Sequence, residues 1–218
     1  MYDYHMHTTF SDGKNTIKEM VETAKKLGLS EIAITDHVWK STKWFDEYRN
    51  EIKQNNSDSI SIKVGFEAKA LSLKGEIDAT DDMILKSDIR LGAIHRIPKS
   101  EGYELYLTRE EVYENKQEAY DNWLQTSKAL LMNKDVDVLA HPFMALNKYK
   151  ISPLEKDVVL LFNIAKEFNK KLEISFRYKK YNDLILKTLY NYPSLLLNIS
   201  YGSDAHSSVE LAKAHKFM

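Results

Sequence analysis

The chain has 218 residues, enough for one domain with a substantial core and too few for two full-sized domains. Lysine and arginine number 31 against 32 aspartates and glutamates, and a net charge of −1 argues against a chain built to coat nucleic acid. Cysteine is absent, which excludes disulfides and thiolate metal sites and leaves histidine, aspartate and glutamate as the available metal ligands.

No segment predicts a membrane span or a secretory signal. The longest apolar run is 158–162, far short of the ~20 residues that a membrane helix needs. The opening residues, MYDYHMH, lack a basic flank followed by an apolar stretch. We therefore expect a soluble, cytoplasmic protein with no membrane partner, and the sequence does not indicate its oligomeric state.

Strand and helix patterns alternate through the first half of the chain. Residues 2–7 predict a strand, and Thr16 with Glu19 predicts a capping box for a helix that Gly28 ends. The remaining expected elements are strands at 31–36, 60–67 and 89–95, a loop with a weak helix over 40–59, and a short helix at 81–86.

The alternation continues in the second half. Thr108 and Glu111 form a second capping box, which opens one long helix. Ser152 as N-cap, with Pro153 at the first helical position, predicts another helix that runs to residue 168. The remaining expected elements are strands at 136–140, 172–176 and 195–201, and helices at 182–190 and 207–215.

These elements make about seven β-then-α units. Strands that alternate with helices predict a parallel sheet with short crossovers, and near seven or eight units such a sheet can close into a barrel. The chain has no Pro/Gly/Ser-rich linker, internal repeat or low-complexity tract. We therefore expect an α/β fold and a single domain over residues 1–218.

Six of the seven histidines fall at or just beyond the end of an expected strand. Because the carboxyl ends of the strands of a parallel barrel share one face, we expect these six to meet there. They are His5, His7, His37, His95, His141 and His206. The seventh, His215, falls inside a helix pattern, and its replacement by alanine is expected to leave activity nearly unchanged.

Each of these motifs is weak when taken alone. His5 and His7 share one face of a strand, and Asp204 and His206 repeat this i, i+2 spacing, but a solvated loop explains the second pair equally well. His95 and His141 are more simply core histidines, and Glu67, at the end of an alternating strand, is equally compatible with a surface position.

Two aspartates near the histidines also have structural explanations. Asp12 is most simply a turn residue, and Asp36 either orients His37 or caps the next turn.

The histidines and carboxylates taken together are more informative than any one of them. Unpaired imidazoles and carboxylates are costly to crowd together, and divalent cations remove that cost by binding them directly. About nine ligands suit two or three ions, which is the arrangement that metal-assisted phosphoester hydrolysis requires.

The ordered series resembles the PHP (polymerase and histidinol phosphatase) family and runs from residue 5 to residue 206, nearly the whole chain. This resemblance implies a distorted (β/α)7 barrel, similar to a TIM barrel, with a trinuclear metal site at the carboxyl ends of the strands. The motifs that carry it are His5-x-His7, Ser11-Asp12-Gly13, Thr35-Asp36-His37, Glu67, His95, His141-Pro142 and Gly202-Ser203-Asp204-Ala205-His206.

The resemblance also implies three ligand sets for zinc, manganese or iron. His5, His7, Glu67 and Asp204 would hold one ion. Glu67 would bridge to a second ion, which His95 and His141 also hold. The third set would be Asp12, His37 and His206; some family members carry a histidine near the Asp12 position.

The implied activity is hydrolysis of a small phosphorylated metabolite by a hydroxide that bridges two ions. Glu67, Asp204 and His206 are the expected catalytic residues, and either His206 or Asp204 is a candidate general acid by proximity. Arg96 and Arg177 follow strand ends, where a guanidinium can clasp phosphate or lie on the surface.

Histidinol phosphate is one candidate substrate. The family's histidinol-phosphatase branch often carries an Asn-rich stretch where this chain has Ser175-Phe176-Arg177-Tyr178, a departure that counts against this substrate. The aromatic residues Trp39, Trp44, Phe45 and Tyr103 either line a substrate pocket or pack the loops.

Two other functions fit the same residues. One is a phosphodiesterase or exonuclease, against which the near-neutral charge and the lack of a basic, aromatic groove count. The other is a non-catalytic metal-binding module. Loss of activity in Glu67→Gln but not in His215→Ala would support the metal centre.

Overall fold

The computed structural model describes residues 1–100, 105–178 and 182–215. The strands are β1 (Tyr2–Asp3), β2 (Glu31–Ile34), β3 (His37–Val38), β4 (Ser61–Lys69), β5 (Ile89–Ala93), β6 (Val138–Leu139), β7 (Lys171–Ser175) and β8 (Ile199–Gly202). The helices are α1 (Ile17–Lys26), α2 (Phe45–Gln54), α3 (Asp81–Lys86), α4 (Arg109–Glu114), α5 (Lys116–Met132), α6 (Met144–Lys148), α7 (Glu155–Glu167), α8 (Asn182–Asn191), α9 (Ser208–His215) and the 3₁₀ segment Pro193–Asn198.

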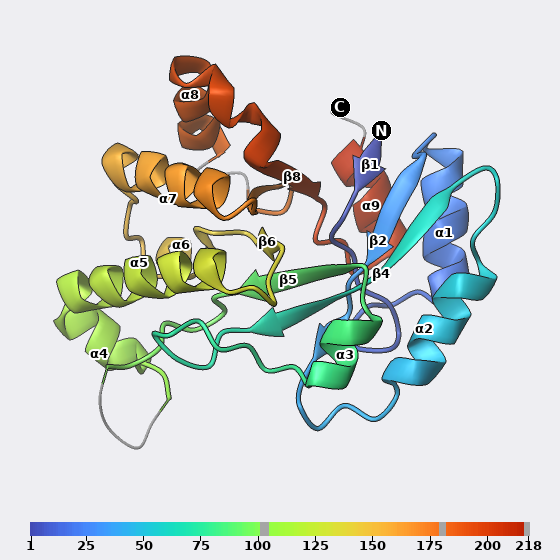
Figure 1. Cartoon of the computed structure of the whole chain (residues 1–218), viewed down its shortest axis with the longest axis horizontal. Helices are drawn as coiled ribbons and strands as arrows, with labels where there is room; N and C mark the ends of the chain where they lie inside the picture. Colours follow the sequence, from blue (N-terminus) through green and yellow to red (C-terminus); the bar gives the residue numbers. More distant parts are fainter. Residues whose placement is uncertain (101–104, 179–181, 216–218) are drawn as a thin grey trace.

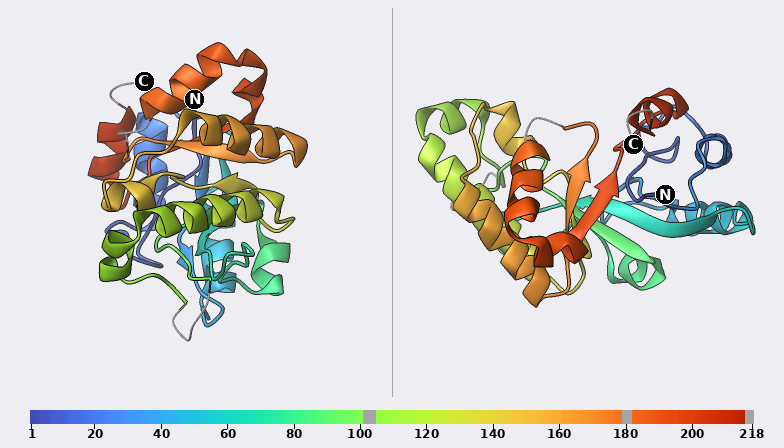
Figure 2. Two further views of the ribbon diagram at one scale, coloured as in Figure 1. Left: turned by 90° about the vertical axis from the view of Figure 1, so that its left-hand side faces the viewer. Right: turned by 90° about the horizontal axis from the view of Figure 1, so that it is seen from above.

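All strand pairs of the sheet are parallel, in the order β1-β2-β4-β5-β6-β7-β8, with β3 pairing alongside β4. Helices cover the outside of the sheet (Figures 1 and 2). The two edge strands come together: Tyr4 N donates to Tyr201 O at 2.9 Å, and Asp204 N donates to His5 O at 2.8 Å. The sheet is therefore nearly closed into a barrel within one domain, as the sequence predicts.

The core follows the expected amphipathic patterns. Trp123, Tyr48, Phe66 and Phe162 are its largest fully buried side chains. The Tyr48 hydroxyl lies among backbone carbonyls, 2.6 Å from Ile34 O. No helix in the described ranges combines the length and the apolar character needed to cross a bilayer.

Several local predictions are confirmed. The capping boxes at Thr16 and at Thr108 both form, with the glutamate three residues later completing each. The helix after Thr108 is not continuous, however. Asn115 ends α4 and caps α5 by accepting from Glu118 N at 3.1 Å.

Two predicted elements form but begin later than expected. The stretch 195–201 is a strand only from Ile199, because Pro193 opens a 3₁₀ segment whose Leu197 side chain is 87% exposed. Ser152 is not an N-cap, since α7 begins at Glu155 and a distant side chain serves its start: Leu154 N donates to the Tyr120 hydroxyl at 3.0 Å.

The remaining differences concern short elements. The first strand covers only Tyr2–Asp3 rather than 2–7, and the strand expected at 136–140 covers only Val138–Leu139. Neither β3 nor α6 was expected from the sequence. These elements are too short to produce a recognisable period.

Candidate metal centre

The nine candidate ligands gather at one end of the barrel, where the strands finish. Each has a side-chain nitrogen or oxygen within 3.3 Å of such an atom in another member. Chain segments as far apart as His5 and His206 therefore build one site. Its members are His5, His7, Asp12, His37, Glu67, His95, His141, Asp204 and His206.

Glu67, on β4, lies at the middle of the site and is only 1% exposed. Its Oε1 lies 2.7 Å from His141 Nε2 and 3.1 Å from His95 Nε2. Its Oε2 lies 2.8 Å from His37 Nδ1. The two oxygens thus face different groups of imidazoles, an arrangement suited to a carboxylate that bridges two ions.

The segments after β1 and β8 form the deepest part of the site. His5 Nε2 and His7 Nε2 are 3.1 Å apart, and Asp204 Oδ1 lies 3.2 Å from His7 Nε2. All three side chains are buried. A further group lies at the rim, where Asp12 approaches His206 Nε2 at 3.3 Å and His37 Nε2 at 3.6 Å.

Several features of this arrangement fit bound cations. His7 Nδ1 is a buried atom without a hydrogen-bond partner in the described part of the chain. Four overlapping groups of three or four of the nine residues place their donor atoms within 4.8 Å of one another. Imidazole and carboxylate are ligands that zinc, manganese and iron accept. The residues present therefore fit a cluster of divalent ions.

Charge and burial act against each other in this centre. Burial would raise the pKa of Glu67, but the surrounding His95, His5 and His141 hold it well below its usual range. Burial would likewise lower the pKa of His5, yet the carboxylates of Glu173 and Glu67 raise it well above its usual range. The Glu67 carboxylate is therefore ionised and needs positive charge beside it.

The backbone is strained at two of the nine positions. His141 has φ of 25° and Asp204 has φ of 51°, in the left-handed region that non-glycine residues rarely adopt. Strain of this kind persists where surrounding contacts fix the conformation, and it gathers at functional sites. Both turns direct a side chain into the centre just after a strand ends.

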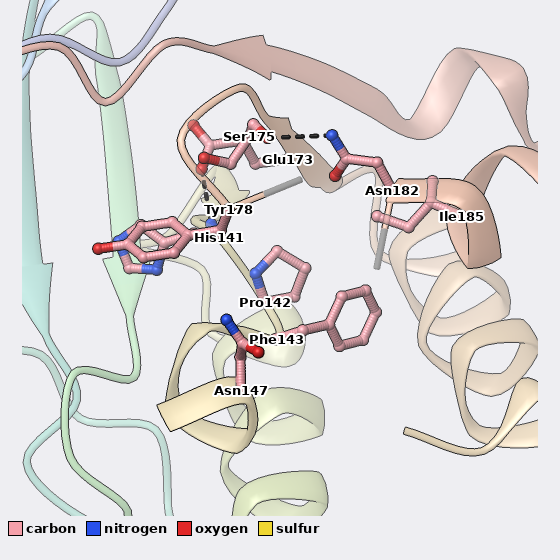
Figure 3. A pocket seen from close by; sticks show the side chains of 9 residues that line it. All are labelled: His141, Pro142, Phe143, Asn147, Glu173, Ser175, Tyr178, Asn182 and Ile185. Atoms are coloured by element: carbon pink, nitrogen blue, oxygen red, sulfur yellow. Dashed lines mark hydrogen bonds between the residues drawn. The ribbon is translucent and has the colours of Figure 1, made fainter. Parts of the chain in front are cut away.

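Glu173, on β7, was not predicted as a site residue from the sequence. Its carboxylate contacts two of the nine candidate ligands. Its Oε1 lies 2.8 Å from His5 Nδ1, and its Oε2 accepts from His141 N at 2.6 Å (Figure 3). Such carboxylates orient metal-bound imidazoles and raise their basicity. The one signal for Glu173 was a lone acidic residue within an apolar strand.

The adjoining hollow in Figure 3 is only about 10 Å³, room for little more than one water.

Asp36 organises the loop that carries Asp12. It is fully buried and accepts hydrogen bonds from both the N–H and the hydroxyl of Thr8, at 2.8 and 2.7 Å. It also accepts from the N–H and the hydroxyl of Ser11, at 3.1 and 2.6 Å. The sequence left two roles open for Asp36, orienting His37 or capping the turn that follows it. The structure shows that Asp36 caps a turn, but this turn is the one after His7.

Asp3 and His215 form a buried pair behind the centre. His215 Nε2 lies 2.8 Å from Asp3 Oδ2, and Asp3 Oδ1 accepts from His5 N at 3.1 Å and Ser203 N at 3.0 Å. Helix α9 is thus tied to the backbone on either side of the centre. His215 is a structural residue rather than an isolated position on a helix.

His215→Ala is therefore expected to lower the free energy of unfolding by about 1–3 kcal/mol, because a buried carboxylate loses its partner. Urea unfolding of the metal-free proteins measures this loss. Lys213→Ala, at an exposed position of the same helix, is the control and is expected to change stability little. Equal stability of the wild type and His215→Ala would contradict the role given to the pair.

The two candidate phosphate-binding arginines have different surroundings. Arg177 Nη1 lies 2.7 Å from His206 Nδ1 and donates to Asp204 O at 3.0 Å, so its guanidinium borders the centre. Arg96 is exposed, and its guanidinium lies 5.0 Å from the centre of the Tyr106 ring. Within the described ranges, no hydrogen bond or ion pair joins Arg96 to the nine residues.

The aromatic residues that were expected either to line a pocket or to pack the loops also differ in their surroundings. Phe45 is buried, and the Trp44 ring packs 5.4 Å from the rings of Phe10 and Tyr48. Trp39 remains 42% exposed beside His37. Tyr103 lies outside the described residues.

A model of the PHP domain family matches residues 3–201. The chain belongs to the PHP family. Seven of the nine candidate ligands fall inside the matched range, and Asp204 and His206 lie just beyond its end.

This PHP protein is similar to two curated proteins, one of similar length and one that is much longer. It is 26% identical over 219 residues to "Probable phosphatase" of Caldicellulosiruptor saccharolyticus, covering 96% of this chain and 81% of the relative. It is 28% identical over 182 residues to "DNA polymerase/3'-5' exonuclease PolX" of Bacillus subtilis, covering 79% of this chain but only 28% of the relative. Family membership and the relative of similar length support a metal-dependent phosphoesterase.

Two solved structures share the fold. A candidate histidinol phosphatase from Listeria monocytogenes has a TM-score of 0.75 at 15% identity, covering 100% of this chain and 99% of the other. The histidinol phosphate phosphatase of Lactococcus lactis, complexed with zinc, L-histidinol and phosphate, has a TM-score of 0.60 at 19% identity, covering 99% and 92%.

Proposed function

We propose that this PHP protein is a metal-dependent phosphomonoesterase that acts on a small phosphorylated metabolite. The observation that carries the proposal is the ring of imidazoles around the two oxygens of the buried Glu67, at 2.7, 3.1 and 2.8 Å. A phosphomonoester is a dianion, and a site of this kind can neutralise it when cations are bound.

The residues suit two or three divalent ions of zinc, manganese or iron. His5, His7, Glu67 and Asp204 would hold one ion, and Glu67 with His95 and His141 a second. Asp12, His37 and His206 would hold the third. When bound, such ions lower the pKa of a water and offset the charge on the phosphoryl oxygens.

Side chains at the rim bear on two further requirements, binding of the phosphate and supply of a proton to the leaving alcohol. Arg177, whose guanidinium contacts Asp204 and His206, would bind the phosphate. Histidine neighbours outweigh burial and hold the pKa of Asp204 below its usual range, so this carboxylate is ionised and has no proton to supply. Of the two candidate general acids, Asp204 is therefore the one that its pKa counts against.

Histidinol phosphate remains a candidate substrate. The Lactococcus lactis neighbour contains L-histidinol and phosphate. Its identity to this chain is low, so the similarity shows a shared fold and not a shared substrate. The proposal therefore concerns a small phosphomonoester, with histidinol phosphate as one compound to measure among several.

Removal of metal is expected to abolish activity and to lower the thermal midpoint of unfolding, because bound ions stabilise only the folded state. Metal content by mass spectrometry, phosphate release from a panel of phosphomonoesters, and thermal unfolding before and after chelation measure both effects. Restoration by zinc, manganese or iron is the control. Absence of both metal uptake and hydrolysis would overturn the proposal.

An exonuclease is the second candidate, favoured by the similarity to the Bacillus subtilis polymerase, of which this chain spans about a quarter. A 5′-phosphorylated single-stranded DNA separates the two functions. A monoesterase releases only the terminal phosphate, whereas an exonuclease shortens the strand.

A further inference from the structure

A small cavity opens onto the metal centre on the β4–β5 side. Its volume is about 110 Å³, less than the roughly 300–1,000 Å³ of pockets that enclose a whole drug-sized ligand. It therefore suits one part of a substrate. The lining residues are His37, Val38, Trp39, Glu67, Lys69 and His95, three of which are candidate metal ligands.

Trp39 forms one wall of this cavity. Its indole is 42% exposed, and the ring centre lies 6.4 Å from that of His37. The backbone at Trp39 is held by a turn, because its N–H donates to Thr42 Oγ1 at 2.9 Å and its carbonyl accepts from Thr42 N at 2.9 Å. A partly exposed indole on this anchored backbone, beside a polar centre, offers an apolar face to a ligand.

Lys69 contributes positive charge to the same cavity. It lies two residues after Glu67 on β4, so both side chains lie on one face of the strand. Its Nζ is 3.3 Å from Asp78 Oδ2, and Asp78 also accepts from Lys40 N at 3.0 Å. This lysine is therefore held at the cavity beside the centre.

We propose that the cavity is the leaving-group subsite, in which a planar aromatic or heteroaromatic ring of the substrate stacks on Trp39. This inference rests on the proposed phosphomonoesterase function and narrows its substrate class. In this assignment Lys69, two residues after Glu67 on β4, acts on the phosphoryl group, which all substrates share, whereas Trp39 acts on the part of the alcohol that differs between substrates. The two side chains should therefore affect specificity differently.

The test compares 2-phenylethyl phosphate with n-butyl phosphate, two esters of primary alcohols that differ in the ring. Specificity constants are measured for the metal-loaded wild type and for Trp39→Ala. We expect the ratio of kcat/KM for the aromatic over the aliphatic ester to fall roughly five- to tenfold in Trp39→Ala. Trp39→Phe should restore most of the ratio.

Two further variants test the assignment of each side chain. Lys69→Met is expected to lower kcat/KM for both esters by a similar factor. Tyr190→Ala removes an 86% exposed aromatic side chain on α8, outside the cavity lining, and should leave the ratio unchanged.

Two outcomes would contradict different claims. Hydrolysis of both esters with a ratio that Trp39→Ala does not change would overturn the subsite and leave the proposed function intact. Hydrolysis of neither ester by metal-loaded wild type would overturn the phosphomonoesterase function, and the subsite with it.

Discussion

Glu67→Gln is expected to reduce phosphoester hydrolysis by about two to three orders of magnitude. The substitution keeps the shape of the side chain but removes its charge and turns one acceptor oxygen into a donor. Both oxygens of Glu67 face imidazoles, at 2.7 Å for His141 and 2.8 Å for His37, so the change affects two groups of ligands together.

The measurements for this variant are kcat/KM and the number of ions bound per chain. Glu31→Gln is a matched control on the adjacent strand β2. Its carboxylate pairs with Lys63 at 2.9 Å and is not one of the nine residues. Full activity and full metal content in Glu67→Gln would exclude a bridging role for this carboxylate.

Gly202→Ala is expected to give the second-largest effect, through Glu173 and His5. A Cβ atom at position 202 would overlap Glu173 Oε1 and lie 2.5 Å from His5 Cβ, so the contact between these two residues must break or shift. Overpacking of this kind costs about 1–3 kcal/mol, and loss of an orienting carboxylate costs about 10–100-fold in metal affinity.

Thermal unfolding and metal titration of Gly202→Ala measure the two losses. Gly92→Ala, on β5, is the matched control. The three atoms nearest to a Cβ there are side-chain atoms of Leu130 and Val136, at 3.1–3.2 Å, so the clash is milder than at Gly202 and does not involve Glu173. If Gly202→Ala bound metal as tightly as Gly92→Ala, Glu173 would have no orienting role.

The order of strands and helices could be predicted because local signals define most elements. Capping boxes at Thr16 and Thr108 and the 3.6-residue apolar periods depend only on neighbouring residues. One failure occurs where a distant contact decides. The Tyr120 hydroxyl, rather than Ser152, accepts a hydrogen bond at the start of α7.

The grouping of the six histidines at one end was predictable for a similar reason, because a parallel barrel places every strand end on one face. Asp12, Glu67 and Asp204 were ambiguous when taken alone, and the family resemblance joined them to the histidines. Their binding of metal stays a prediction. The supporting residues were not predictable, because the roles of Glu173 and Asp3 depend on partners 168 and 212 residues away in the chain.

The meeting of β1 with β8 has a consequence for biosynthesis. His5 and Asp204 stand near opposite ends of the chain and are joined by the hydrogen bond from Asp204 N to His5 O. A nascent chain that has left the ribosome only as far as β7 carries seven of the nine donors but neither Asp204 nor His206. If the nine residues bind metal as proposed, the complete site can form only after residue 206 has left the ribosome.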